Sequence, residues 1–533
     1  MLFHALGFML LFLPVVLAGH AWMARWRGVS ASLAWLIGAS LFFYGWWYPP
    51  HLLLLLFSVS VNFLLGERLA RKPSQVVLWF GIGFNLVLIG LFKYADFAVL
   101  TLDALAGSAV VPPSLLLPLA ISFFTFQQIA FLVDVHAGRI RPCGPMRYLF
   151  FVSFFPQLVA GPIVHHRQLV PQIDPGLGTV RARALALGLA VFVVGLVKKV
   201  MIADPLGAFA DPMFAQALEA NGGSGAPIGP GLIEAWGGTT AFTFQLYFDF
   251  SGYSDMAVGL AMMFGIRLPF NFDAPYRASG IVDFWRRWHM TLSAFLRDHL
   301  YVPLGGSRQA WPGWAAALMT TMVLGGLWHG AAWTFVAWGA LHGLLLLIAH
   351  GWRHLVHRRR SSLRPVAGSG EARARRWSRP IAHVAGVALT FACVHLAWVL
   401  FRAESFAAAL SVYGGMLGLN GVRLPEYYLD MLGSWGPILQ ARGVSFAPLR
   451  DFAFGGMEQI AITALAALLV FFAPTTQRLF GLAGDPCGSS STTSAPGIVR
   501  PNFSWGLTTG VALAVVISTL LSDPPDVFIY FQF

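Results

Sequence analysis

The sequence predicts an all-α, polytopic integral membrane protein, and three observations point to this fold class. Hydrophobic residues make up 57% of the 533 residues. Charged residues make up only 11%, against roughly a quarter in typical soluble proteins, so a soluble fold of this size could not cover its surface with charge. Uncharged runs long enough to cross a bilayer, which takes about 20 apolar residues, recur from one end of the chain to the other.

The uncharged runs give the order of the expected helices. They cover 1–24, 28–66, 73–92, 104–133, 148–166, 309–352, 380–401 and 501–522, with shorter or interrupted candidates at 184–203, 235–266, 405–422 and 459–477. Pro49-Pro50 divides one run into two helices with a tight turn, and the run 309–352 is too long for one crossing. We expect roughly eleven to thirteen transmembrane or re-entrant helices around a central channel.

The basic residues indicate orientation rather than a nucleic-acid partner. The formal net charge is +12, but the cations lie in short clusters between apolar runs, where cytoplasmic loops of membrane proteins carry them. The strongest cluster, 353–379, holds nine arginines and one acid. We therefore predict a basic cytoplasmic loop over 353–379 and no nucleic-acid partner.

A histidine inside an apolar run is the first candidate for function. His329 follows Trp328 within the uncharged run 309–352, beside several glycines. Polar side chains are costly in lipid and usually face a cavity or a partner, and a neutral imidazole suits proton exchange near neutral pH. A histidine that only hydrogen-bonds a neighbouring helix fits the pattern equally well. His342 would lie on a different face of a continuous helix, so we expect a packing residue, or one that supports the site through its neighbours, rather than a direct partner of His329.

The segment 271–306 is too charged to span a membrane and too aromatic for an ordinary loop. It predicts helices in the membrane interface, with aromatic rings at headgroup depth and arginines toward water or an anionic ligand. A simple interfacial anchor is the alternative. His289 lies in the middle of this segment, in which aromatic residues alternate with charged ones: Trp285, Trp288, Phe295 and Tyr301 with Arg286, Arg287, Arg297 and Asp298.

Two acids, Asp249 and Asp255, interrupt another apolar run. Such carboxylates could pair with arginine or histidine of the neighbouring segment 271–306, or line a water-filled path. A structural ion pair and a catalytic role both remain open for them. The sequence contains no Walker A loop, HExxH motif, dinucleotide fingerprint or GxSxG elbow, and its three scattered cysteines lack metal-ligand spacing, so we expect no metal.

Several elements of the chain resemble the membrane-bound O-acyltransferase family. Trp328-His329-Gly330 resembles the family's histidine signature, and the likeness is closer to its bacterial branch of alginate O-acetyltransferase and teichoic-acid D-alanyl-transfer proteins. Further elements resemble that branch: FPQLVAGPI at 155–163, YFDFSGYSDMAVG at 247–259, FWRRWHMTLSAFLRDHLYVPLGG at 284–306 and the ending FIYFQF at 528–533. Together these elements extend over nearly the whole chain.

The resemblance implies a multi-pass protein of the bacterial inner membrane. It would take acetyl from acetyl-CoA, or an acyl group from a carrier, and deliver it for O-acylation of an exopolysaccharide such as alginate, with periplasmic acetyltransferase partner proteins and no tightly bound cofactor. By motif position, His329 would be the catalytic histidine and His289 the second histidine. The substrate-binding candidates are Trp328, Gln157, Asp249, Asn271, Trp285, Arg286, Arg287 and Arg297.

The same resemblance suggests one domain over 1–533 in consecutive sections. These are peripheral N-terminal helices (1–140), a catalytic helical core (about 141–352), the basic loop (353–379) and C-terminal helices (380–533). Within the acyltransferase class, D-alanyl transfer or acylation of peptidoglycan or cellulose are alternatives. A polysaccharide or proton-coupled transporter is the alternative from another class, but the internal repeats common in transporters are not evident.

Overall fold

The structure is a computed structural model that describes residues 2–107, 110–159, 161–220, 229–362, 369–449, 452, 456–482, 497–499, 502–522 and 528–529. Within these ranges the backbone is helical apart from connecting segments and two short strands. This confirms the predicted all-α class. The chain divides into two compact units, each built from segments that are separated in the sequence.

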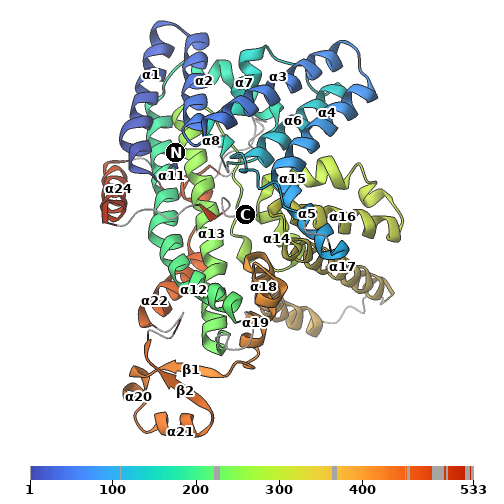
Figure 1. Cartoon of the computed structure of the whole chain (residues 1–533). Helices are drawn as coiled ribbons and strands as arrows, with labels where there is room; N and C mark the ends of the chain where they lie inside the picture. Colours follow the sequence, from blue (N-terminus) through green and yellow to red (C-terminus); the bar gives the residue numbers. More distant parts are fainter. Residues whose placement is uncertain are drawn as a thin grey trace. The chain divides into compact units, whose positions relative to one another are not determined.

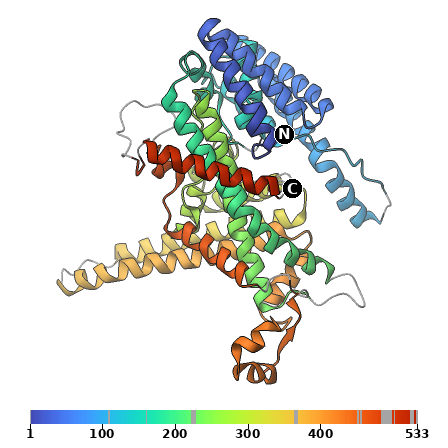
Figure 2. The ribbon, with the colours of Figure 1, turned by 90° about the vertical axis from the view of Figure 1, so that its left-hand side faces the viewer.

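The first unit comprises residues 1–201, 249–271 and 474–533. Its early helices form antiparallel pairs, α1 with α2 and α3 with α4 (Figure 1). Its elements are η1 (Phe8–Phe12), α1 (Leu13–Trp26), α2 (Val29–Gly45), α3 (Pro49–Arg71), α4 (Gln75–Ile89), η2 (Gly90–Tyr94), α5 (Ala95–Ala106), α6 (Ile121–His136), α7 (Pro145–Ser153), α8 (Phe155–Leu158), α9 (His166–Leu169), η3 (Val170–Gln172), α10 (Ile173–Leu177), α11 (Ala182–Leu196), α23 (Thr476–Leu479) and α24 (Phe503–Ser522). Helix α24 packs beside α11 (Figure 2).

The second unit comprises residues 202–248 and 272–473. Its elements are α12 (Asp204–Glu219), η5 (Pro275–Arg277), α14 (Ile281–Arg287), α15 (Met290–Leu296), η6 (Arg297–Tyr301), η7 (Gly306–Arg308), α16 (Trp311–His329), α17 (Trp333–Ser362), α18 (Ser369–Arg402), α19 (Phe406–Met416), β1 (Val422–Pro425), α20 (Tyr427–Leu432), α21 (Trp435–Ala441), β2 (Val444–Ala447) and α22 (Met457–Phe472). The strands pair in parallel, with Val422 opposite Val444. The elements η4 (Val197–Ala203) and α13 (Leu232–Met263) contribute residues to both units.

Seven helices among the described residues are long and apolar enough to cross a membrane. They lie at 8–26, 49–71, 75–106, 182–219, 333–355, 380–402 and 503–522, and shorter apolar helices lie at 29–45, 406–416 and 457–472. Their exposed side chains include many large apolar residues, as expected for surfaces that face lipid rather than water. The protein is therefore a multi-pass membrane protein.

Local sequence explains where the first helices begin and end. The prolines at 49 and 50 occupy the first turn of α3, where a missing N–H costs nothing. The predicted break of the run 28–66 is thus confirmed. Helix α3 ends on Arg68 and Arg71, whose charge complements the carboxyl end of a helix.

The run 309–352 forms a helical hairpin, because α16 ends at His329 and α17 begins at Trp333. The helices approach closely at two glycines. A Cβ on Gly326 would collide with the Phe335 carbonyl oxygen and lie 3.0 Å from the Gly339 Cα atom. Absence of side chains therefore allows the two backbones to touch and fixes the end of α16.

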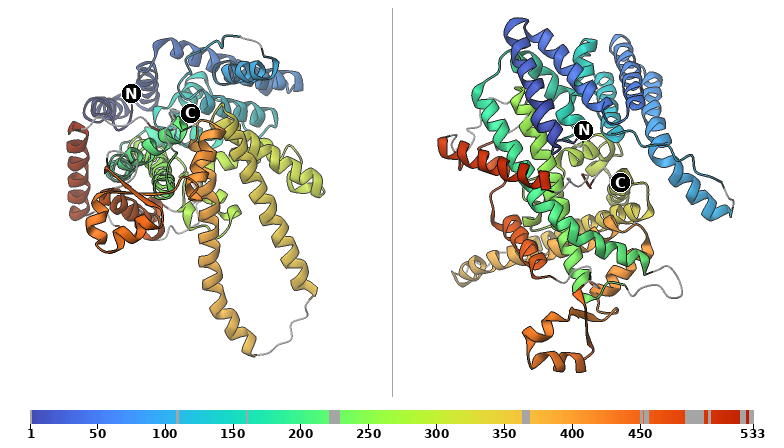
Figure 3. Two further views of the ribbon diagram at one scale, coloured as in Figure 1. Left: turned by 60° about the horizontal axis from the view of Figure 1, so that its bottom comes forward. Right: turned by 60° about the vertical axis from the view of Figure 1, so that its left-hand side comes forward.

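The basic tract 353–379 is less of a loop than the sequence suggests. Helix α17 continues to Ser362 and α18 begins at Ser369, so most of the tract has helical backbone. The two helices are in contact along part of their length and diverge toward the basic tract (Figure 3, left). Regular helix is favoured here because arginine is a good helix former. Of the nine arginines, only the Arg353 side chain lies within the described part; the side chains of 356–379 lie outside it.

Candidate active site

His329 is the last residue of α16 and is held in an aromatic cage in the second unit. Its side chain is only 4% exposed. The centroid of its ring lies 5.2 Å from that of Trp338 on α17, 5.3 Å from that of Phe401 on α18, and 5.0 Å from that of Trp328. Three helices therefore fix the imidazole in surroundings that exclude water.

His289 is the second histidine of this site. It joins α14 to α15 with φ of 41° and ψ of 56°, a left-handed conformation that a non-glycine residue adopts only when its surroundings enforce it. Its ring is fully buried, with the centroid 6.5 Å from that of His329 and 6.0 Å from that of Trp328. Strained backbone of this kind gathers at functional sites, which supports a positioning role.

The protonation state of His289 follows from its burial. Desolvation lowers its pKa to about 3, because removing a group from water disfavours its charged form. The imidazole is therefore neutral at physiological pH, with one nitrogen able to donate a hydrogen bond and the other able to accept one.

The aromatic residues of the segment 271–306 pack into the same unit. Trp285 contacts Trp338, with ring centroids 5.9 Å apart, and Trp288 contacts Trp398 at 5.0 Å. The Trp398 indole donates a hydrogen bond to the Tyr276 hydroxyl at 3.1 Å. These rings form one continuous aromatic cluster around the two histidines, so their segment does more than anchor the chain at an interface.

The predicted arginines differ in how much of their charge is already compensated. Arg287 pairs with Asp283 at 3.0 Å, one helical turn earlier. Arg297 pairs with its neighbour Asp298 at 2.7 Å on an exposed surface. Arg286 is exposed and belongs to no ion pair among the described residues. It is thus the member of this group with the most available positive charge for an anionic ligand.

Three of the predicted substrate-binding residues belong to the first unit, whereas the two histidines belong to the second. Gln157 is buried and its amide donates to the Phe151 carbonyl oxygen. Asn271 is also buried. Asp249 pairs with Lys199 at 2.7 Å and accepts a hydrogen bond from the backbone N–H of Ile529. Their roles toward substrate stay predictions.

The two acids in α13 both form ion pairs, one of the possibilities that the sequence left open, but their partners are lysines. Lys198 pairs with Asp255 at 2.6 Å and Lys199 pairs with Asp249, whereas the sequence suggested arginine or histidine of 271–306 as possible partners. The reason is close packing of α11 on α13. A Cβ at Gly252 would lie 2.8 Å from the Gly195 carbonyl oxygen, so the two helices approach closely just before the lysines.

Sequence reasoning did not single out Phe401 or Trp398. Both end an ordinary apolar run on α18, far along the chain from His329, and nothing in a run of that kind indicates which ring meets the histidine. The sequence associates Trp338 with the site more readily, because this residue follows the Trp-His-Gly element by only a few residues. Among the described residues, no group of three or more His, Cys, Asp or Glu side chains is arranged to hold a metal ion.

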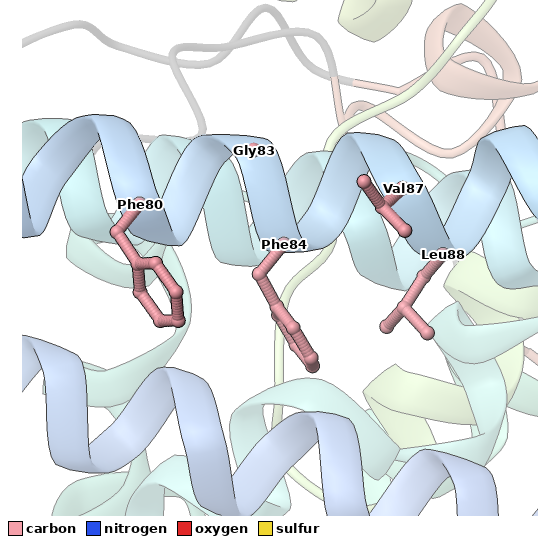
Figure 4. A pocket seen from close by; sticks show the side chains of 5 residues that line it. All are labelled: Phe80, Gly83, Phe84, Val87 and Leu88. Atoms are coloured by element: carbon pink, nitrogen blue, oxygen red, sulfur yellow. The ribbon is translucent and has the colours of Figure 1, made fainter.

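One apolar groove belongs to the first unit. It has a volume of about 360 Å³ and is lined by Phe80, Gly83, Phe84, Val87 and Leu88, all on α4 of the first unit (Figure 4). Since α4 lies within a candidate membrane span, this groove faces an environment suited to lipid chains. It contains none of the predicted site residues.

Comparison with known proteins identifies the family of the chain. The family model for the membrane-bound O-acyltransferase family matches residues 136–365, which include both histidines. The chain is 38% identical to a peptidoglycan O-acetyltransferase of Helicobacter pylori, over 80% of this chain and 81% of that protein. It is 34% identical to the probable alginate O-acetylase AlgI of Pseudomonas aeruginosa over 100% of both chains. It is 28% identical to a teichoic acid D-alanyltransferase of Streptococcus thermophilus, over 54% of this chain and 69% of that one.

Two of these relatives exceed 30% identity over most of both chains, and their names agree on acyl transfer. A buried histidine pair in an aromatic cage at the end of a membrane hairpin is compatible with that chemistry. The chain belongs to the membrane-bound O-acyltransferase family and is a multi-pass membrane acyltransferase.

Proposed function

We propose that this protein is an O-acetyltransferase of the bacterial inner membrane that moves acetyl groups from cytoplasmic acetyl-CoA to an exopolysaccharide, with alginate as the first candidate acceptor. The relatives named as alginate O-acetylases support the acceptor. The observation that carries the proposal is the buried pair of His329 and His289 inside an aromatic cage.

In the proposed reaction, a neutral His329 removes the proton from an acceptor hydroxyl while that oxygen attacks the acetyl carbonyl carbon. The new C–O bond forms, the C–S bond of the thioester breaks, and the proton passes from the imidazolium to the departing thiolate. General-base catalysis of this kind contributes about 10² to 10⁴ in rate. In this proposal His289 orients His329 or positions the acceptor or the reacting carbonyl, and the 6.5 Å separation of the two ring centroids supports this role.

The aromatic cage has a second role in this proposal. Trp328, Trp338 and Phe401 surround His329 with rings rather than water. Excluding water protects the thioester from hydrolysis and strengthens the polar interactions inside the site. Because His329 is 4% exposed, these side chains have to move for the thioester and the hydroxyl to reach it.

The donor is proposed to dock through its phosphates. Arginine pairs well with phosphate because its guanidinium offers several donors in a planar fork. Arg286 and Arg353 are both exposed, and Arg353 opens the basic tract 353–379. Arg287 and Arg297 are weaker candidates because an acid already compensates each.

Peptidoglycan is a second candidate acceptor. The Helicobacter pylori relative is named as a peptidoglycan O-acetyltransferase and is 38% identical to this chain. Both acceptors present hydroxyl groups outside the cytoplasm, so His329 would perform the same step on each. The acceptor hydroxyl at His329 belongs either to the polymer itself or to a periplasmic acetyltransferase partner that then passes the acetyl group to the polymer, and labelling without added partner distinguishes these two routes.

The test supplies inner membranes that contain the full-length protein with acetyl-CoA radiolabelled in the acetyl group, together with alginate or peptidoglycan. We expect label in a polymer as alkali-labile ester, and no such label with the His329→Gln variant. Label in alginate alone, or in peptidoglycan alone, decides between the acceptors. Equal labelling by the wild type and by His329→Gln would contradict the proposal, as would a donor requirement that acetyl-CoA does not meet.

A further inference from the structure

His342 is a buried, polar side chain that the proposed reaction does not use. It lies on α17 and has no solvent exposure. Neither of its ring nitrogens has a hydrogen-bond partner among the residues that the structure describes. Buried polar groups in proteins are nearly always hydrogen-bonded, so an exception of this kind calls for an explanation. Packing alone does not explain this exception, because an apolar ring would fill the same space without burying two nitrogens that lack hydrogen bonds.

The surroundings of His342 are aromatic and uncharged. Its ring centroid lies 4.7 Å from that of Trp338 and 5.3 Å from that of Trp285. The indole nitrogens of both tryptophans are buried and also lack an acceptor among the described residues. An indole N–H can only donate, whereas a neutral imidazole carries one donor and one acceptor. The cluster therefore offers three buried donors and one buried acceptor to a ligand.

The position of His342 along α17 indicates which substrate it faces. Trp338 contacts both His329 and His342, so His342 lies one ring away from the catalytic histidine. Further along α17, the arginines at 286 and 353 both act electrostatically on His350. His342 is thus located on α17 between the catalytic histidine and the exposed arginines proposed to bind phosphate.

We propose that His342 is a binding residue for an amide group in the arm of the acyl donor. One ring nitrogen donates to the amide carbonyl oxygen and the other accepts from the amide N–H. A secondary amide matches a neutral imidazole in having one donor and one acceptor. The donor class is an acyl thioester on an amide-containing arm that ends in phosphate, as in acetyl-CoA. This inference rests on the proposed function, since it assumes that the donor reaches His329 along α17.

Trp285 is the side chain through which the arm gains access. It is only partly buried, and it contacts both His342 and Trp338. Rotation of this one indole would open one side of the His342 ring, which also contacts Phe284 and Trp398, and the Trp398 N–H is held by Tyr276. Trp285 also precedes Arg286 in α14, so one short helix carries both the proposed gate and the proposed phosphate contact.

The test compares His342→Phe, which keeps a ring but removes both nitrogens, with His342→Gln, which retains a donor and an acceptor. Acetyl transfer by purified full-length protein in lipid nanodiscs is measured over a range of acetyl-CoA concentrations. For His342→Phe we expect the KM for acetyl-CoA to rise about tenfold, because the variant loses about one net hydrogen bond to the donor. The kcat should stay within about twofold of the wild-type value. His342→Gln should recover most of the loss in KM.

A second measurement separates binding from folding. The thermal midpoint of each variant is recorded with and without unreactive CoA. His342→Phe should be as stable as the wild type without CoA but gain a smaller shift when CoA is added, because weaker binding stabilises less. An unchanged KM and an unchanged CoA shift in His342→Phe would overturn the inference. Absence of acetyl-CoA-dependent transfer by the wild type would instead overturn the proposed function.

Discussion

Two regions of the protein differ in how they hold buried ionisable groups. In the first unit, Lys199 and Asp249 are almost completely buried and compensate each other at 2.7 Å. In the second unit, His289 and His329 lie among aromatic rings. Oppositely charged groups that pair hold helices together, whereas a neutral imidazole suits proton transfer. The comparison predicts that substitutions at the ion pair change stability and that substitutions at the histidines change catalysis.

Removing one member of the buried pair should have the largest effect on stability. Lys199→Met leaves the Asp249 carboxylate buried without its cation, which typically costs about 3 to 5 kcal/mol. We expect a strongly lowered thermal midpoint in detergent, together with less protein recovered from the membrane. The midpoint is measured by following tryptophan fluorescence on heating.

The double variant Lys199→Met with Asp249→Leu sharpens this prediction. Replacing both charges by apolar groups removes the uncompensated carboxylate, so stability should return to near that of the wild type. If the double variant recovers stability but loses acetyl transfer, Asp249 has the substrate role that the sequence suggests. If both recover, its carboxylate serves only the ion pair and the contact with Ile529.

A close approach between helices should matter less than a buried charge. Gly326→Ala places a methyl group against the Phe335 carbonyl oxygen and the Gly339 backbone, and overpacking of this kind costs about 1 to 3 kcal/mol. Because His329 ends the same helix, we expect reduced acetyl transfer as well as a lower midpoint. Gly38→Ala is the control, since a Cβ there meets nothing within 4 Å. Equal thermal midpoints for the two variants would show that α16 and α17 can move apart at Gly326 without loss of stability.

Much of the fold and of the site was predictable from the sequence. The part that was not predictable is which residues, distant from one another in the sequence, come into contact. The run 28–66 broke at Pro49 because proline constrains the chain locally, and His329 was notable because a polar residue in an apolar run is costly. The partners of Asp249 and Asp255 were not predictable. Which lysine meets which acid depends on the close approach of Gly195 and Gly252, and such contacts between separate helices leave no periodic signal in either one.

Substitutions of the exposed arginines should change the thermal midpoint least. Arg297 is 62% exposed at its side chain and pairs only with Asp298, and exposed pairs contribute about 0 to 1 kcal/mol. Arg297→Ala should therefore leave the midpoint nearly unchanged. Arg286→Ala should also preserve stability but raise the KM for acetyl-CoA more than Arg297→Ala does, because no acid among the described residues compensates Arg286. A larger KM change at Arg297 would reverse the assignment of the docking arginine.

The most direct test of the account is the single-turnover rate of acetyl transfer at saturating acetyl-CoA, measured together with the thermal midpoint for His329→Gln. The matched control is His383→Gln, which makes the same substitution at an exposed histidine on α18. The account predicts a rate lowered by about 10² or more for His329→Gln, an unchanged midpoint, and a normal rate for His383→Gln. A normal rate in folded His329→Gln protein would contradict it.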